Sequence, residues 1–194
     1  MRWNNAPTIQ KRNDSTTMAR VPLIGEDRSD LGPFINRVKK ERGKLINLYR
    51  VLLNSPPVAE QWLNFNSAIR YATTLDAALR EMIILRVSLL NGAQYQAQIH
   101  GASHALKAGL SKEQIADLAD WQPSTRFTAA QRAALAWTDA MTRDIEVPDA
   151  LHAELKKHFD DCAVTEITVL AGAYNMHTRV ARALQIDPEK PASA

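Results

Sequence analysis

Apolar residues recur at three- and four-residue intervals along almost the whole chain, and no stretch alternates long enough to indicate a strand. This spacing places apolar side chains on one face of a helix, whereas alternation would place them on one face of a strand. The sequence therefore predicts an all-α fold. A length of 194 residues and a hydrophobic fraction of 45% suit one globular domain with loose ends.

Capping residues and helix breakers divide this pattern into segments. Asp76 is suited to cap a helix through its side-chain oxygen, and Asn91-Gly92 tolerates the left-handed geometry that ends one. Ser111 and Thr128 each precede a glutamine by three residues, which is the spacing of a capping box. Together with prolines, these signals predict helices after Pro33, through residues 45–52, over 58–71, 76–90 and 94–107, from 111, from 128, over 148–159 and over 163–184.

Two details of these helices bear on the core. In the third helix, Trp62, Leu63, Phe65 and Ile69 are expected to face inward. In the fourth, the motif Glu81-Met-Ile-Ile-Leu85 is similar to Glu166-Ile-Thr-Val-Leu170 of the last helix. Two related helical halves would explain this similarity, and chance would explain it nearly as well.

A single domain is expected over residues 21–187. Residues 1–20 are basic and lack the apolar run of a secretory signal, so we expect either a disordered tail there or sequence upstream of a start at Met18. Residues 188–194 combine prolines with small side chains and are expected to form a second disordered tail.

Charge and composition disfavour several kinds of partner. The net charge is +3, but Lys and Arg are interspersed with acidic residues, so no nucleic acid partner is expected. The apolar runs are too short for a transmembrane helix, so no membrane partner is expected. Cys162 is the only cysteine of the chain. It allows no intrachain disulfide and fits a reducing, cytoplasmic location.

Cofactor and metal signatures are absent from the sequence. It contains no glycine-rich phosphate loop, nucleophile elbow or dinucleotide fingerprint, so no cofactor is expected. His104 follows His100 by four residues, but no further ligands complete a metal site, so no metal is expected.

The strongest candidate for a site is a polar set in an otherwise apolar stretch: Glu81, Tyr95 and His100. Burying a carboxylate among Ile and Leu side chains costs free energy unless a partner satisfies it. An imidazole beside a carboxylate can also transfer a proton near neutral pH, because the carboxylate raises the imidazole pKa. The residue types alone leave both interpretations open, a polar group satisfied in the core or an acid–base pair.

The same region resembles the carboxymuconolactone decarboxylase family, which includes the alkyl hydroperoxidase D proteins. The similarity covers about residues 62–118, and its most specific part is His100, the segment 105–110 and the capped helix at Ser111. The resemblance implies an all-helical fold, a homo-oligomer (dimer, trimer or hexamer) and a site near a subunit contact.

In the hydroperoxidase branch of that family, a Cys-x-x-Cys pair precedes the histidine, and a glutamate on the previous helix completes a proton relay. The cysteine positions fall on Ala93 and Gln96, the relay glutamate on Glu81, and a histidine between the cysteines on Tyr95. Thiol-based peroxide reduction needs an attacking and a resolving thiol. Peroxiredoxin-type activity is therefore disfavoured.

The decarboxylase branch works without cysteines, and the resemblance implies Glu81, Tyr95 and His100 as catalytic residues. A small carboxylate or lactone substrate also needs a cationic partner, for which Arg86 and Arg70 are near in sequence. The expected function is cofactor-free, decarboxylase-like acid–base chemistry. The alternatives are an alkyl hydroperoxidase D-like antioxidant and a non-catalytic oligomeric protein that binds a ligand.

The last helix contains further candidates in Tyr174-Asn-Met-His-Thr-Arg179, which resembles a segment near the C-terminus of many cysteine-free relatives. Asn175 and Arg179 are four residues apart and therefore share one helix face. They are expected either to bind substrate in the crevice or to hold a subunit interface.

Overall fold

The computed structural model describes residues 19–93 and 102–189, and every regular element in these ranges is a helix. The all-α prediction is therefore confirmed. Two short 3-10 turns, η1 (Ser29–Leu31) and η2 (Leu118–Asp120), were not predicted. The α-helices are α1 (Gly32–Arg42), α2 (Asn47–Leu52), α3 (Pro56–Tyr71), α4 (Ala77–Leu90), α6 (Ala102–Lys107), α7 (Lys112–Asp117), α8 (Ala129–Arg143), α9 (Asp149–Lys156) and α10 (Asp161–Ala183).

The helix ends agree with the capping signals of the sequence. The Asp76 side chain accepts hydrogen bonds from the first turn of α4, and both Ser111 and Thr128 form complete capping boxes. Gly92 follows α4 with a φ of 58°, a left-handed conformation that favours glycine. Asn91, by contrast, has a φ of −84°, so the glycine alone supplies the left-handed residue of this pair.

The prediction that Phe65 faces inward is wrong, because this side chain is 40% exposed. The buried face of α3 instead contains Trp62, Asn66 and Ile69. Phe65 lies about 40° beyond Ile69 around the helix, at the exposed edge of that face. The inward face of α3 is therefore partly polar.

The helix α9 ends earlier than the sequence predicts. It stops at Lys156, three residues before the expected Phe159.

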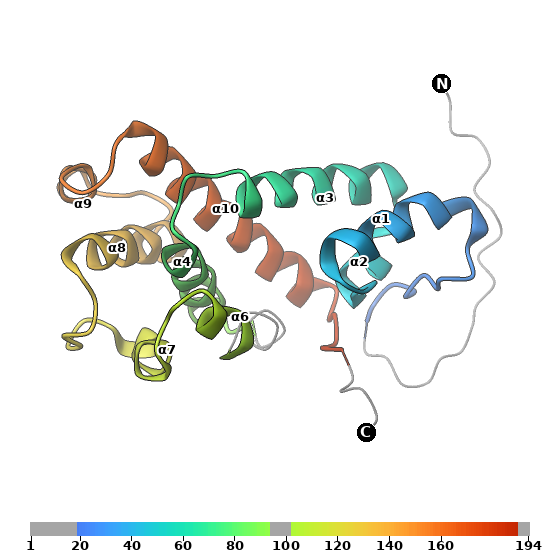
Figure 1. Ribbon diagram of the computed structural model, residues 1–194, viewed down its shortest axis with the longest axis horizontal. Coiled ribbons are helices and arrows are strands. Elements are labelled where there is room, and N and C mark those ends of the chain that lie inside the picture. The colour runs from blue at the N-terminus through green and yellow to red at the C-terminus, as the bar shows by residue number, and fades with distance from the viewer. Residues whose placement is uncertain (1–18, 94–101, 190–194) are drawn as a thin grey trace.

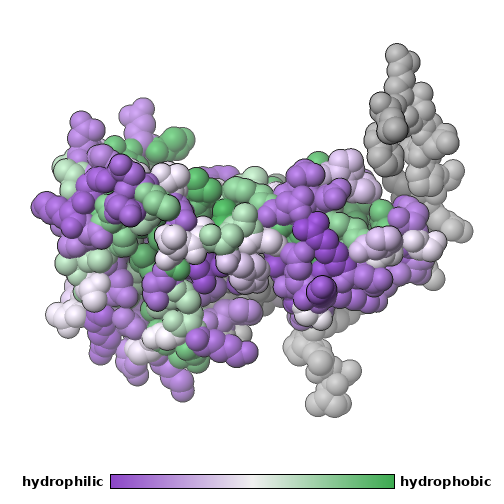
Figure 2. Space-filling view, turned by 45° about the horizontal axis from the view of Figure 1, so that its top comes forward, coloured by the Kyte–Doolittle hydropathy of each residue, from purple (hydrophilic) through white to green (hydrophobic). Residues whose placement is uncertain are grey.

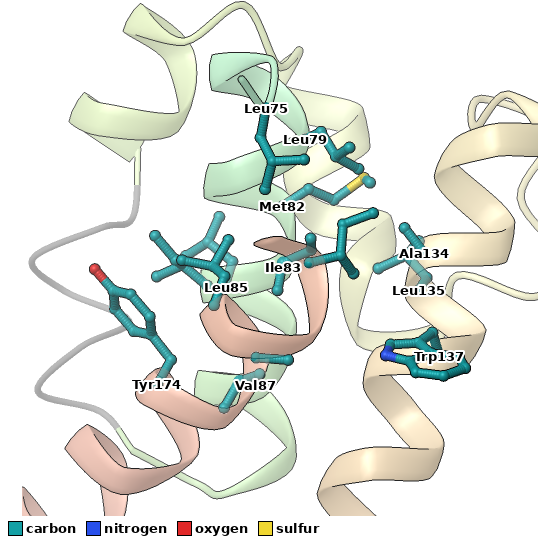
Figure 3. Packing of buried hydrophobic residues seen from close by; sticks show 14 of the residues in the cluster. Leu75, Leu79, Met82, Ile83, Leu85, Val87, Ala134, Leu135, Trp137 and Tyr174 are labelled. Carbon is teal, nitrogen blue, oxygen red and sulfur yellow. The ribbon is translucent and has the colours of Figure 1, made fainter. Parts of the chain in front are cut away.

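Two hydrophobic clusters fill the interior. The larger one joins α4, α8 and α10 around residues such as Ile83, Leu135 and Leu170 (Figure 3). The smaller one joins α1, α2 and the first half of α3 to the end of α10, with Val38 and Leu63 at its centre. Figure 1 shows α1 and α2 at one end of the molecule and α8 and α9 at the other, with α3 and α10 running between them.

The surface of the described residues contains both hydrophobic and hydrophilic side chains. On the face shown in Figure 2, hydrophobic and hydrophilic residues are interleaved. Within these ranges, no helix is both long and apolar enough to cross a membrane. The expected tails, residues 1–20 and 188–194, fall largely outside the described ranges and stay predictions, as does the extent of the domain.

Removing the cap of α4 is expected to destabilise the protein measurably. The Oδ1 atom of Asp76 accepts hydrogen bonds from the amides of Ala78 and Leu79, at 2.9 and 3.1 Å. Asp76→Ala should lower the free energy of unfolding by about 1 kcal/mol in urea denaturation, and Asp76→Asn, which keeps an acceptor, by much less. Equal stability of the alanine variant and the parent would contradict the capping role.

Candidate functional site

Only part of the expected catalytic set lies within the described residues. Glu81 is on the second turn of α4 and is buried, with 5% of its surface exposed. Tyr95 and His100 lie outside the described residues, so their expected roles stay predictions. The site is therefore built here from Glu81 and the described side chains around it.

Arg70, in the last turn of α3, forms an ion pair with Glu81. Its Nη2 lies 3.4 Å from Glu81 Oε1, and both side chains are largely buried. Burial opposes the charge of Arg70, but Tyr174, Tyr71 and Glu81 together raise its pKa, so it stays a guanidinium. The pair therefore places one negative and one positive charge side by side between α3 and α4.

Tyr174 of α10 adds a phenol to this charged pair. Burial raises the pKa of its hydroxyl well above the usual range, and the Glu81 carboxylate adds to this effect, whereas Arg70 opposes it. Tyr174 therefore stays a neutral phenol, able to donate a hydrogen bond or accept one. Figure 3 shows its ring at the border of the larger cluster, with the hydroxyl pointing away from Ile83 and Leu135.

Three buried polar atoms on α3 have no hydrogen-bond partner among the described residues: Nε1 of Trp62, Oδ1 of Asn66 and Nε of Arg70. These residues are spaced four apart, so they form one stripe on the helix, which we call the α3 polar stripe. The orientation of the Asn66 amide is fixed, because its Nδ2 donates to the backbone oxygen of Trp62 at 2.8 Å. The unpaired atom is thus an acceptor, with an unpaired donor on either side. Unpaired buried polar atoms cost free energy and require an explanation.

The α3 polar stripe lies beside aromatic residues of α10. The rings of Trp62 and His177 are stacked, with centroids 4.6 Å apart and planes 17° apart. Tyr174 lies next to them, 4.8 Å from the His177 ring. The sequence alone predicts no role for Tyr174, His177 or Asn66. The signal was present in their spacing, since Tyr174 and His177 share a face of α10 and Asn66 lies between Trp62 and Arg70.

Arg70 also connects this interior to the surface. The ring of Tyr71, which is 61% exposed, lies 5.4 Å from the Arg70 guanidinium and 5.3 Å from that of Arg42. The polar set thus extends from the buried Glu81 through Arg70 to the solvent-exposed end of α3.

The structure places Arg86 away from this set. Its guanidinium is 2% exposed and binds both carboxylate oxygens of Asp139, at 2.6 and 2.7 Å. Its Nη1 donates to the backbone oxygens of Leu118 and Ala119. These contacts occupy the guanidinium within the core, so we withdraw Arg86 as a substrate-binding residue. Local sequence does not indicate this role of Arg86, because its partner Asp139 lies 53 residues away in the chain and only the tertiary fold brings the two together.

Asn175 and Arg179 belong to a second polar network. The Asn175 amide donates to Thr142 at 3.0 Å and accepts from Asn91 at 2.9 Å, which links α10 to α8 and to the end of α4. Arg179 Nη1 donates to Asn175 Oδ1 at 2.6 Å. Neither the substrate role nor the interface role expected for these two residues is tested by these contacts.

No group of three or more His, Cys, Asp or Glu side chains within residues 19–93 and 102–189 is arranged to hold a metal ion. The described part of Glu81's surroundings offers a carboxylate, a guanidinium, a phenol and unpaired hydrogen-bonding atoms. This set suits recognition of a polar molecule and transfer of a proton.

The chain is similar in sequence to known proteins. Residues 56–140 match the model of the Carboxymuconolactone decarboxylase family. The uncharacterized protein YnjA of Escherichia coli is 31% identical over 118 residues, which are 60% of this chain and 64% of YnjA. This chain therefore spans less than two thirds of that relative.

Solved structures agree with this similarity. A protein of unknown function from Agrobacterium tumefaciens, described as a candidate antioxidant defence protein AhpD, is 27% identical with a TM-score of 0.67, covering 72% of this chain and 96% of that one. An uncharacterized peroxidase-related protein from Silicibacter sp. TM1040 is 21% identical with a TM-score of 0.77, covering 94% of this chain and 96% of that one. At that identity the second structure supports the fold alone.

Proposed function

We propose that this chain, a member of the carboxymuconolactone decarboxylase and AhpD-like superfamily, catalyses cofactor-free acid–base chemistry on a small carboxylate or lactone. The observation that carries the proposal is the buried Glu81 carboxylate, paired with Arg70 beside the unpaired atoms of the α3 polar stripe. A carboxylate is costly to bury, and its arrangement beside other polar groups favours a functional site.

Substrate recognition is assigned to the α3 polar stripe and the Arg70 guanidinium. A guanidinium binds a carboxylate strongly because charge and donor geometry match. Trp62 Nε1 and Arg70 Nε supply donors, and Asn66 Oδ1 supplies an acceptor. A small molecule with acidic and carbonyl or hydroxyl oxygens would satisfy these atoms, whereas a hydrocarbon would leave them unpaired.

Proton transfer is assigned to Glu81 together with His100. In a decarboxylation, the bond between the substrate carbon and its carboxylate breaks, carbon dioxide leaves, and the electron pair stays on the substrate as a dienolate. His100 then gives a proton to that carbon, while Glu81 orients the imidazole and passes to it a proton taken up from water, which restores the imidazolium. The place of His100, and of Tyr95 beside it, in this scheme rests on the sequence resemblance.

The antioxidant alternative receives less support from the chain itself. The positions of the two redox thiols are Ala93 and Gln96, and Cys162 is the only cysteine. Disulfide chemistry within one chain requires two thiols. Non-catalytic ligand binding is the remaining alternative, and it differs from the proposal in binding without turnover.

We further propose that the protein is a cytoplasmic homo-oligomer. On α3, Val58 and Phe65 are 50% and 40% exposed, and they lie seven residues apart on one side of the helix. Exposed apolar side chains on one helix face favour a protein contact. Sedimentation of the purified protein measures the assembly directly, and a monomer at all concentrations would contradict this part of the proposal.

A thermal-shift screen of small carboxylates and lactones, including carboxymuconolactone, tests the recognition step. A ligand that binds only the folded protein raises the melting temperature by mass action. We expect at least one hit, and we expect its shift to be lost in Asn66→Leu, which removes the unpaired acceptor. Asn64→Leu is the matched control, because Asn64 lies two residues away on the exposed side of α3.

Two outcomes of this screen would contradict the proposal. A panel without any hit would reject the substrate class. A hit whose shift is the same in the parent and in Asn66→Leu would remove the α3 polar stripe from the site, since the shift would then arise elsewhere.

A further inference from the structure

We propose that the adjoining ends of α4 and α10 form a second site, which binds a small anion carrying a phosphate or carboxylate group. A hollow of about 280 Å³ lies there, lined by Asn91, Thr178, Arg179 and Arg182. Asn91 and Glu81 are ten residues apart on α4, which corresponds to about 15 Å along the helix. The lining includes no residue of the Glu81–Arg70 pair or of the α3 polar stripe, so the inference does not depend on the proposed function.

Two positive charges border this hollow without a carboxylate partner in residues 19–93 and 102–189. Of the ion pairs among the described residues, none includes Arg179 or Arg182. Arg179 contacts Asn175 through Nη1, and Arg182 contacts the backbone oxygen of Asn91 through Nη1. A guanidinium has five N–H groups, and Nε and Nη2 of each arginine make no hydrogen bond to the part of the chain that the structure describes, so they can bind an anion.

The positive charge of the two arginines is larger than the negative partial charge of the helix ends beside them. Each helix C-terminus contributes roughly half a negative charge, so the ends of α4 and α10 contribute about −1 in total. Two guanidinium groups contribute +2. The local excess of about one positive charge means that the arginines do more than neutralise helix ends.

Neighbouring residues hold both arginines in place. A Cβ atom on Gly92 would lie 3.0 Å from Arg182 Nη1, so the glycine permits the close approach of this side chain. Arg179 rests on Asn175, whose amide is held in turn by Thr142 and Asn91. Binding to groups already held in position loses less side-chain entropy than binding to mobile ones.

The size and exposure of the hollow limit which ligands can bind there. Both arginines are exposed, so an anion reaches them from solvent without opening the fold. A volume of about 280 Å³ lies just below the usual range for small-molecule sites, which is roughly 300–1,000 Å³. The ligand is therefore a small molecule with one anionic group, or the free anion.

Isothermal titration with inorganic phosphate and with phenyl phosphate, at an ionic strength kept constant with sodium chloride, tests this site. We expect saturable binding of phosphate by the parent protein, and binding roughly tenfold to a hundredfold weaker in Arg179→Gln/Arg182→Gln. Arg80→Gln is the matched control, because Arg80 also has a backbone oxygen as its partner but lies at the opposite end of α4. Tighter binding of phenyl phosphate would assign an organic phosphate, and equal binding the free anion.

Arg182→Lys distinguishes binding of an anion from a purely structural contact between α4 and α10. Lysine keeps the positive charge but lacks the planar guanidinium group. We expect it to fold like the parent and to bind phosphate with intermediate affinity. Phosphate binding that is absent in the parent, or unchanged in the double variant, would overturn the proposal and leave the two arginines as braces of α4 and α10 only.

Discussion

Asp139→Ala is expected to lower the free energy of unfolding by about 3–5 kcal/mol, the largest stability effect that the structure supports. Arg86 is 2% exposed and binds both carboxylate oxygens of Asp139, and Trp121 Nε1 donates to the same carboxylate at 3.2 Å. Removing the carboxylate leaves a charged guanidinium buried without its counter-ion. The cost arises from this unpaired charge rather than from the attraction lost.

Urea denaturation of three proteins measures this effect: the parent, Asp139→Ala and Arg143→Gln. Arg143 also approaches Asp139, with Nη1 at 3.7 Å from Oδ2, but its side chain is 53% exposed. Exposed pairs contribute roughly 0–1 kcal/mol, so this control should be nearly as stable as the parent. Equal stability of Asp139→Ala and Arg143→Gln would contradict the structural role given to Arg86.

The largest effect on activity is expected from Glu81→Gln. Glutamine has almost the same shape and still accepts a hydrogen bond from Arg70, but it neither binds nor releases a proton in the relevant pH range. Loss of a general acid–base group typically costs about 10²–10⁴-fold in rate. Turnover of carboxymuconolactone, or of a substrate found in the ligand screen, should fall by this factor.

Glu166→Gln is the matched control for this experiment. Glu166 stands at the corresponding place in the similar motif of α10, where its carboxylate accepts hydrogen bonds from the backbone and side chain of Thr74. This variant should keep its turnover. Full activity of Glu81→Gln in a folded protein would assign Glu81 to the core and remove it from the reaction.

The fold was predictable from local signals because helix periodicity and caps are local. The caps Asp76, Ser111 and Thr128 lie at the helix starts that the sequence predicts. The inward face of α3 was predicted less well. Phe65 was assigned to it by hydrophobicity, whereas the structure places the polar Asn66 there, next to Trp62 and Arg70.

The sequence predicts only those residues of the candidate site that stand out in their local sequence. Glu81 was recognised because a carboxylate is unusual in an apolar helix. The role of Arg86 was not, because its partner Asp139 comes from another helix far along the chain. The proximity of Arg70 and Tyr174 to Glu81 likewise depends on the packing of α3 and α10 against α4, which helix periodicity does not encode.

The central claim is that this protein transfers protons through Glu81 and does not use thiol chemistry. The most direct test measures turnover of one substrate by the parent, Cys162→Ser and Glu81→Gln under identical conditions. Since Cys162 is the only cysteine, its serine variant is a chain without thiols. We expect this variant to be fully active and Glu81→Gln to be inactive. Loss of turnover in Cys162→Ser, with retention in Glu81→Gln, would contradict the claim.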